Sequence, residues 1–222
     1  MNQFDLPIFD TSLNPIATYD QLFSTNQFTG IDRIQNANQV TAGVTSRFIK
    51  SDTGYDVLDM SIGDIYYFAD RQVELATTPI PAPNPVLEAN TEKFSPIVSQ
   101  INWQFKRFWN ATGNLAYDPN GHFVQNSNVA LTYNADNNHI LSSSYGFVQN
   151  GDPLVSYSSP QNNFQQFSLG LSWPLNYQWQ FLGAENYNVS HGYVQTFFYG
   201  LEYHSCCWAI RLLNSKTYIG LE

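Results

Sequence analysis

The stretch Gln166–Trp173, QFSLGLSW, decides the fold class because apolar and polar or small residues alternate along its whole length. Its odd-numbered positions are Phe, Leu, Leu and Trp, and its even-numbered positions are Gln, Ser, Gly and Ser. Side chains at alternate positions of a β-strand project to opposite faces. The stretch therefore predicts a strand with one apolar face and one polar face.

The same two-residue period recurs through most of the chain, and short polar turns separate many of the repeats. We expect further strands near residues 39–50, 55–68, 100–106, 115–117, 128–133, 139–147, 178–187, 193–204 and 208–213. The tight turns are predicted at 51–54, 110–113, 135–138, 174–177 and 205–207, and long loops at 71–93 and 150–163. Short and long connections at opposite strand ends are typical of outer-membrane barrels, whose short turns are periplasmic.

The composition is unusual for a soluble domain of 222 residues. Charged residues make up 12% of the chain, against roughly 25% in average proteins, and aromatic residues make up 16%. No apolar run reaches the roughly 20 residues that a membrane-spanning helix needs. The net charge of −9, without a basic cluster, argues against nucleic acid as a partner.

These patterns predict an all-β fold, an antiparallel transmembrane β-barrel of which this chain supplies part, with about ten strands. The alternative is a soluble β-sandwich that binds glycans through Tyr, Trp and Asn, and a further alternative is a passive porin. A sandwich core would have to bury strand faces rich in Gln, Asn and Ser, which is costly without hydrogen-bond partners.

The two cysteines, Cys206 and Cys207, are adjacent in the segment GLEYHSCCWAIRL, residues 200–212. Neighbouring residues rarely bridge each other, because a disulfide needs Cα atoms about 4.4–6.8 Å apart. In an oxidising compartment, such a pair at a β-turn indicates two bridges to another region or chain. The alternative is a pair of free thiols, one buried on each side of a strand.

Three segments together resemble the barrel domain of the LptD family, the lipopolysaccharide-assembly proteins of Gram-negative outer membranes, also called organic solvent tolerance proteins. They are LFSTNQFTGIDRIQNANQVTAGVTSRF at 22–48, IGDIYYF at 62–68, and the cysteine segment at 200–212. The resemblance covers about residues 20–213 and suggests part of the second half of the barrel.

The resemblance implies a role in inserting lipopolysaccharide into the outer leaflet. It also implies a lipoprotein plug, LptE, inside the barrel, and a periplasmic N-terminal domain, absent here, that receives lipopolysaccharide from the periplasmic Lpt bridge. Carried over by position, Cys206 and Cys207 would each form a disulfide with a cysteine near that domain. Such bridges would orient the domain against the barrel.

The loop motif Asp32-Arg33 matches the family's external loop, where a loop-packing ion pair is expected and contact with substrate sugar or phosphate is the alternative. Gln27 and Asn36 depart from the family's usual arginine and aspartate, which puts a loop salt bridge there in doubt. Plug contacts, or simply a hydrated lumen, are expected at the polar strand positions Gln100, Asn102, Gln104, Gln166, Ser168 and Ser172.

In domain terms, we expect a strand end and a long extracellular loop over residues 1–38, barrel strands over 39–213, and a truncated end over 214–222. No signal peptide is visible, and Leu221-Glu222 resembles a cloning remnant.

His139, His191 and His204 are too scattered in the sequence to form a zinc site. No catalytic residue, metal or cofactor is therefore predicted, and a barrel lipase or acyltransferase is the enzymatic alternative.

Overall fold

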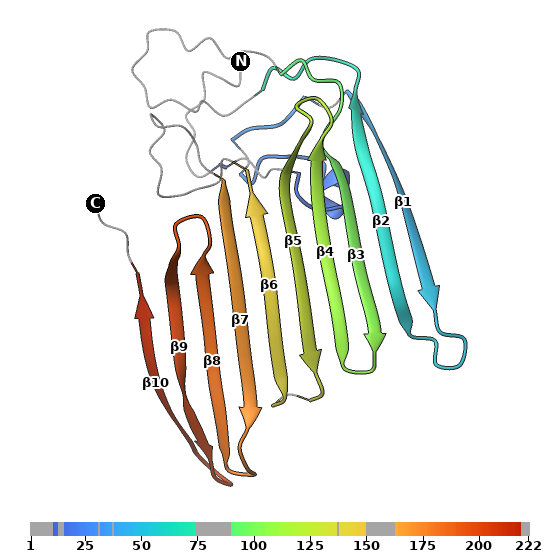
Figure 1. The fold of residues 1–222 in the computed structure, drawn as a ribbon. Helices are drawn as coiled ribbons and strands as arrows, with labels where there is room; N and C mark the ends of the chain where they lie inside the picture. Colours follow the sequence, from blue (N-terminus) through green and yellow to red (C-terminus); the bar gives the residue numbers. More distant parts are fainter. Residues whose placement is uncertain are drawn as a thin grey trace. The chain divides into compact units, whose positions relative to one another are not determined.

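The computed structural model describes residues 11–12, 16–30, 32–36, 38–73, 90–136, 138–149 and 163–218. The fold is all-β, as the alternation predicted. Ten antiparallel strands form one sheet in the order β1-β2-β3-β4-β5-β6-β7-β8-β9-β10 (Figure 1). Every strand pairs with its neighbours in sequence, and the sheet is open, which is consistent with part of a barrel.

Each strand is nine to twelve residues long, the length that a tilted strand needs to cross a bilayer. The strands are β1 Gln39–Ile49, β2 Asp56–Tyr67, β3 Ile97–Lys106, β4 Trp109–Asp118, β5 Phe123–Asn134, β6 Ile140–Val148, β7 Phe164–Pro174, β8 Trp179–Asn188, β9 Tyr193–His204 and β10 Ala209–Thr217. A short 3-10 helix, η2, spans Asp20–Phe23. In the part of the chain that is described, no helix is long and apolar enough to span a membrane.

The predicted turn at 110–113 is wrong. The chain reverses at Arg107-Phe108, and β4 then runs from Trp109 straight through residues 110–113. Gly113 lies inside this strand, where a Cβ atom would come within 3.0 Å of Ile101 Cγ2. The glycine therefore permits a close approach between side chain and backbone, and does not mark a reversal. The long loops predicted at 71–93 and 150–163 lie largely outside the described residues.

The chain divides into two compact units. The first unit contains residues 1–45, 61–99 and 116–124. Its described part holds a small hydrophobic core, in which the N-terminal segment packs against strand residues. The members of this core are Ile16, Leu22, Ile65, Tyr67, Val98 and Ala116, with Tyr19 packed against them.

Two glycines make room for the N-terminal segment in this unit. A Cβ atom at Gly63 would lie 2.8 Å from Leu22 Cδ1, and one at Gly43 would lie 2.5 Å from the Tyr19 hydroxyl. The Thr41 hydroxyl also donates a hydrogen bond to the Leu22 carbonyl, at 3.2 Å. Because these side chains occupy the space above the strands, larger residues at either glycine would displace the segment.

The second unit contains residues 46–60, 100–115 and 125–222. Its strands β6 to β10 are in continuous antiparallel register, with one irregularity between Asn186 and Tyr187. None of the hydrophobic residues described in this unit is buried. The described strands of the second unit thus have no buried hydrophobic core of their own.

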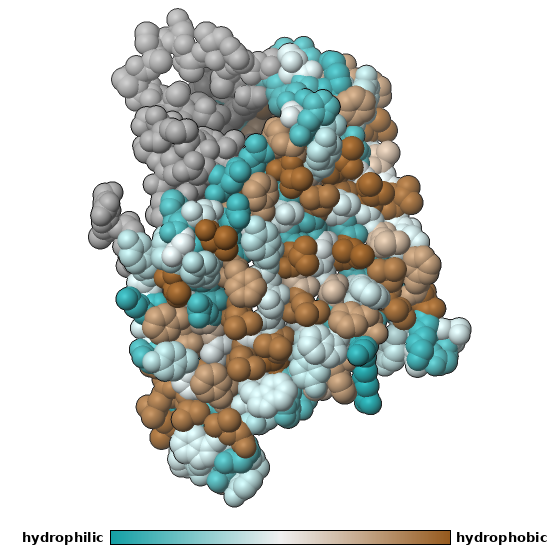
Figure 2. All heavy atoms as spheres, viewed as in Figure 1, coloured by the Kyte–Doolittle hydropathy of each residue, from teal (hydrophilic) through white to brown (hydrophobic). Residues whose placement is uncertain are grey.

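One face of the second unit is apolar. Alternation places Leu171 of β7 beside Leu141 of β6 and Gly183 of β8, and Leu201 of β9 beside Phe181 and Leu212. Figure 2 shows strongly hydrophobic residues in brown, mixed with residues of intermediate and low hydropathy, over the strands.

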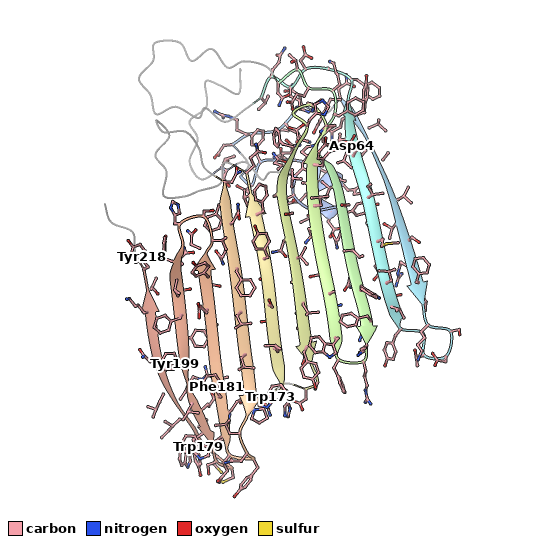
Figure 3. The ribbon with its side chains drawn as sticks, viewed as in Figure 1. Asp64, Trp173, Trp179, Phe181, Tyr199 and Tyr218 are labelled. Atoms are coloured by element: carbon pink, nitrogen blue, oxygen red, sulfur yellow. The ribbon has the colours of Figure 1, made fainter. Side chains whose placement is uncertain are left out.

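Aromatic side chains gather near the short turns of this unit. Tyr133 and Trp173 stack with ring centroids 6.2 Å apart, and Trp179 meets Tyr203 at 5.0 Å. Figure 3 labels Trp173 and Trp179 at this end of their strands, and Tyr218 at the opposite end of β10. Aromatic girdles at both edges of an apolar band are typical of membrane barrels.

Candidate functional site

The cysteines occupy the tip of the β9–β10 hairpin. His204 and Ala209 are the last paired residues, and the Ser205 N–H donates to the Trp208 carbonyl at 2.8 Å. Cys206 and Cys207 are therefore the two central residues of a tight turn, and both are exposed. The alternative that placed them on opposite sides of a strand is wrong.

The two thiols lie against each other, with 3.1 Å between the Sγ atoms of Cys206 and Cys207. Two-residue hairpin turns usually need residues with positive φ. His122 is the one non-glycine residue with positive φ among those described, so neither cysteine adopts that conformation. The turn holds both sulfur atoms in contact without using the backbone conformations that favour glycine.

Their hydrogen bond separates the acidities of the two thiols. The contact with the Cys207 thiol lowers the pKa of Cys206, with a smaller contribution from the Ser205 hydroxyl. The same contact, followed by desolvation, raises the pKa of Cys207. Cys206 is therefore the readier of the two to form a thiolate, the nucleophilic form of cysteine.

A charged cluster lies next to this turn. The Glu202 side chain is only 9% exposed and contacts Arg211 Nε of the facing strand. Its other carboxylate oxygen lies 2.7 Å from His204 Nε2. A nearly buried carboxylate needs such partners to offset its desolvation. No pattern in the sequence predicts this cluster, although Glu202 and Arg211 lie within the cysteine segment at 200–212.

An aromatic row supports the same hairpin. The Trp208 ring lies 5.1 Å from that of Tyr203, which in turn lies 5.0 Å from Trp179. The Gln178 side-chain amide donates to the Tyr203 hydroxyl at 3.1 Å. The cysteine turn is thus flanked by contacting aromatic rings and by ion pairs.

The opposite face of β6 to β9 is polar, and three of the expected lumen residues lie on it. The Gln166 amide donates to the Ser168 hydroxyl at 3.0 Å, and Ser172 accepts from the buried Gln180 at 2.6 Å. The strand register places Asn186 next to Ser168 on this face. The predicted positions on β7 therefore take part in two separate hydrogen-bonded pairs on this face.

The expected lumen residues of β3 are also hydrogen bonded. Asn110 of β4 donates to Asn102 at 2.6 Å, and Gln104 donates to the Arg107 carbonyl at 3.3 Å. Gln100 shares their face by alternation.

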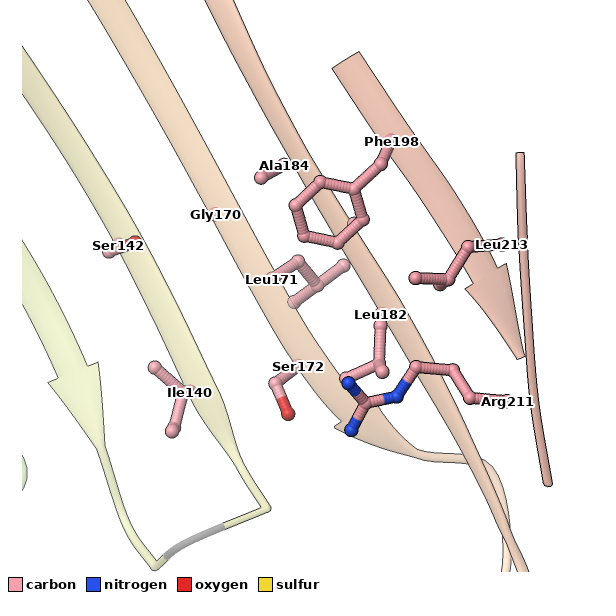
Figure 4. Close-up of a pocket in the computed structure, with 11 residues that line it drawn as sticks. Ile140, Ser142, Gly170, Leu171, Ser172, Leu182, Ala184, Phe198, Arg211 and Leu213 are labelled. Carbon is pink, nitrogen blue, oxygen red and sulfur yellow. The ribbon is translucent and has the colours of Figure 1, made fainter. Parts of the chain in front are cut away.

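An apolar groove interrupts the polar face. The groove was not predicted from the sequence. Its volume is about 390 Å³, and Leu182, Phe198 and Leu213 are among the eleven residues that line it (Figure 4). Arg211 reaches from β10 along one end of the groove. The available signal was a break in the alternation, because β8 and β9 place Leu and Phe at positions where the neighbouring strands have Ser and Gly.

The predicted loop motif lies in the first unit. Arg33 is buried and its Nη1 donates to the Asp32 carbonyl at 2.9 Å, while the Thr11 hydroxyl donates to the Asp32 carboxylate at 2.8 Å. At the two positions that depart from the family pattern, neutral hydrogen bonds are present. Gln27 donates to the Tyr67 hydroxyl at 3.2 Å, and Asn36 accepts two backbone N–H groups at 2.9 Å.

The described residues contain no group of three or more His, Cys, Asp or Glu side chains placed to hold a metal ion. His139 instead contacts Asp136 of its own turn at 2.8 Å, and His204 contacts Glu202.

The comparisons with known proteins all indicate the same family. The model of the family "LptD: LPS transport system D" matches residues 1–179. The LPS-assembly protein LptD of Legionella pneumophila (strain Lens) is 36% identical over the whole chain, which covers 27% of that relative. The same-named proteins of Coxiella burnetii (strain RSA 493) and Pseudomonas aeruginosa (strain LESB58) are 35% and 31% identical, over 100% and 96% of this chain and 25% of each relative. The chain spans about a quarter of the length of these curated relatives.

Proposed function

The chain belongs to the LptD family, and on that premise we propose that it forms part of an outer-membrane translocon that inserts lipopolysaccharide into the outer leaflet. The observation that carries the proposal is the two-faced sheet of the second unit. One face is apolar and edged by aromatic rings, as a lipid-facing surface must be. The other carries hydrogen-bonded polar side chains, as expected of a lumen.

The polar face is proposed as the surface that receives the LptE plug. Buried polar side chains such as Gln180 and Glu202 give it fixed hydrogen-bonding groups. The apolar groove beside Phe198 gives it a site where a plug would exclude water. The positions Gln100, Asn102, Gln104, Gln166, Ser168 and Ser172 are proposed contacts on the same grounds.

Cys206 and Cys207 are proposed to form the covalent link to the periplasmic N-terminal domain of a full-length family member. Their place in an exposed hairpin turn leaves both sulfur atoms accessible to a second domain. Each bridge would stabilise the folded protein by about 2–4 kcal/mol. The greater consequence is orientation, because two adjacent anchors fix a domain against the barrel and so toward the periplasmic Lpt bridge.

The proposed role is transport without a covalent step on the lipid, so no side chain is assigned a catalytic part. Asp32 and Arg33 are proposed to pack an external loop, since Arg33 is buried and Thr11 holds the Asp32 carboxylate.

The proposal is tested in a full-length family member that carries this segment in a Gram-negative host. Replacing Cys206 and Cys207 together by Ser is expected to lower the lipopolysaccharide exposed at the cell surface, measured by surface labelling. A non-reducing peptide map of the unmodified protein from native outer membranes is expected to show both cysteines bridged to distant ones. Free thiols at both positions, with unchanged surface lipopolysaccharide in the variant, would contradict the proposal.

The two alternative functions, a glycan-binding sandwich and a passive porin, predict different behaviour of the same protein. A glycan-binding sandwich would fold in detergent-free buffer and gain stability from sugars. A passive porin would make vesicles permeable to small solutes and would not depend on the cysteine pair.

A further inference from the structure

A polar cluster interrupts the apolar face of the second unit on strands β8, β9 and β10. The strand register places Glu185 beside Phe197, and Phe197 beside Lys216. Leu169 lies on the other side of Glu185, so this row belongs to the same face as Leu171. An acid and a base therefore lie two strands apart on a mainly apolar surface, with their backbones roughly 10 Å from each other.

The next facing pair on this surface, toward the cysteine turn, is also polar. Tyr199 of β9 lies beside Asn214 of β10, and the Asn214 amide donates to the Tyr199 hydroxyl at 2.8 Å. Figure 3 labels Tyr199 on β9, and 49% of this residue is exposed. The amide orients the Tyr199 hydroxyl, whose own proton is not used in this bond.

The two charged side chains of the cluster have no ionic partner in the described part of the chain. Glu185 and Lys216 are exposed, and neither forms a salt bridge with a residue that the structure describes. Charged side chains on the lipid face of a barrel are costly, and ionisable residues within a membrane usually mark a functional site. A ligand that pairs with both charges would offset this cost.

The cluster lies toward the end of the sheet opposite the cysteine turn. Tyr187 lies two residues beyond Glu185 on β8, Tyr218 directly follows β10, and the rings of Tyr193 and Tyr218 are 4.6 Å apart. Tyrosine rings at the edge of a membrane protein lie at the level of the lipid head groups. With the orientation of the function proposed above, the cluster therefore lies just inside the head groups of the outer leaflet.

An apolar groove of about 380 Å³ lies on the same face, nearer the cysteine turn. It is lined by Trp179, Leu201, Tyr203, Trp208, Ile210 and Leu212. Leu212 precedes Lys216 by four residues, which is about 13 Å along β10. The volume is within the range of roughly 300–1,000 Å³ that is typical of ligand pockets. One amphiphile can therefore reach the two charges with its head group and the groove with a hydrocarbon chain.

We propose that this surface is a binding site for a zwitterionic phospholipid, such as phosphatidylethanolamine. Lys216 binds the phosphate, Glu185 accepts hydrogen bonds from the ammonium group, and the Tyr199 hydroxyl donates to an oxygen of the head group. An acyl chain follows β9 and β10 into the groove between Leu201 and Trp208.

The balance of charge selects this class of lipid. One acid and one base give the site no net charge, and a head group with one phosphate and one ammonium group complements both. A lipid with several anionic groups would be repelled by Glu185. The ligand therefore differs from the lipopolysaccharide that is the cargo of the proposed translocon.

The test uses the full chain in detergent micelles, with its strand content checked by circular dichroism. Trp103, Trp109 and Trp173 are replaced by Phe, so that fluorescence reports only the two tryptophans of the groove. Phosphatidylethanolamine with brominated acyl chains should quench this fluorescence in a saturable manner. The midpoint should be about tenfold lower than that of brominated phosphatidylglycerol, whose head group lacks the ammonium.

Two variants separate the roles of the charges. Lys216→Gln should raise the midpoint for both lipids, because both contain the phosphate. Glu185→Gln should raise it for phosphatidylethanolamine alone and so remove the preference between the lipids. Lys93→Gln, which removes the same charge in the other unit, is the matched control for Lys216→Gln and should change neither midpoint.

Quenching that does not saturate, or equal midpoints for the two lipids on the chain with Glu185 and Lys216 intact, would overturn the proposal. So would unlabelled lipopolysaccharide that displaces the brominated lipid as well as unlabelled phosphatidylethanolamine does. Binding in micelles involves no transport. Its failure would remove only the phospholipid site, whereas failure of the surface-labelling test would remove only the transport role.

Discussion

Replacing Leu171 by Arg tests whether the apolar face of the second unit faces lipid. Leu171 lies in the central part of β7, between Leu141 and Gly183 on the neighbouring strands, so no acidic side chain is paired with it across either ladder. An arginine at the midplane of a barrel's lipid face costs about 2–4 kcal/mol. A free-energy cost of this size lowers the folding equilibrium constant in a bilayer by roughly 30- to 700-fold.

Ser168→Arg on the same strand is the matched control. Ser168 belongs to the polar face, beside Ser144 and Asn186, and the substitution removes the hydrogen bond from Gln166. The loss of that bond is worth about 0.5–1.5 kcal/mol. A lumen that contains water accommodates the new charge at little further cost.

The assay is the free energy of folding of the full chain into phospholipid vesicles, obtained from urea titrations followed by tryptophan fluorescence. Leu171→Arg is expected to be the more damaging variant by at least about 0.5 kcal/mol. If Ser168→Arg is equally or more damaging, the polar face is buried in protein. The reasoning from face chemistry to a membrane barrel would then be refuted.

Three further substitutions test separate features. Glu202→Gln should lower the free energy of unfolding, measured by urea titration, by about 1.5 kcal/mol, because Arg211 and His204 lose a charged acceptor. The loss should be smaller at high salt than at low salt. Gly63→Val should lower the free energy of unfolding by about 1–3 kcal/mol, because the new side chain displaces Leu22. At Gly146 a Cβ atom meets nothing nearer than 3.6 Å, so Gly146→Val should cost clearly less in the same titrations. Equal effects of the two substitutions would contradict the close packing of Gly63 against Leu22. The pKa of Asp136 is lowered by hydrogen bonds from two backbone N–H groups of the same turn. The ionised carboxylate therefore stabilises the fold fully above the unfolded-state pKa of about 3.9. This stabilisation is lost as the pH falls through the lower folded-state pKa. Asp136→Asn should therefore reduce stability at neutral pH and shrink the loss between about pH 7 and pH 2, and an unchanged pH profile would contradict this assignment.

Periodicity in the sequence was enough to predict the sheet because a strand is a local structure. The alternation in 166–173 depends only on which side each residue projects to, and β7 and its two faces follow from it. The turn at the cysteines was predictable for the same reason, since polar and small residues there interrupt two alternating segments. The turn after β3 was misplaced because glycine at 113 resembles a reversal signal, while its actual reason is the close approach of Ile101 from the neighbouring strand.

The sequence by itself determined an all-β antiparallel chain with an apolar and a polar face, and its motifs pointed to the LptD family. Only the tertiary structure decided which residues on different strands meet. The Glu202 cluster with Arg211 depends on the β9–β10 register, and the apolar groove depends on how Leu182 and Phe198 line up across β8 and β9. The 3.1 Å contact of the two thiols likewise depends on the conformation of the turn. Strand pairing sets these positions, and a one-residue shift in register would move every such side chain to the other face.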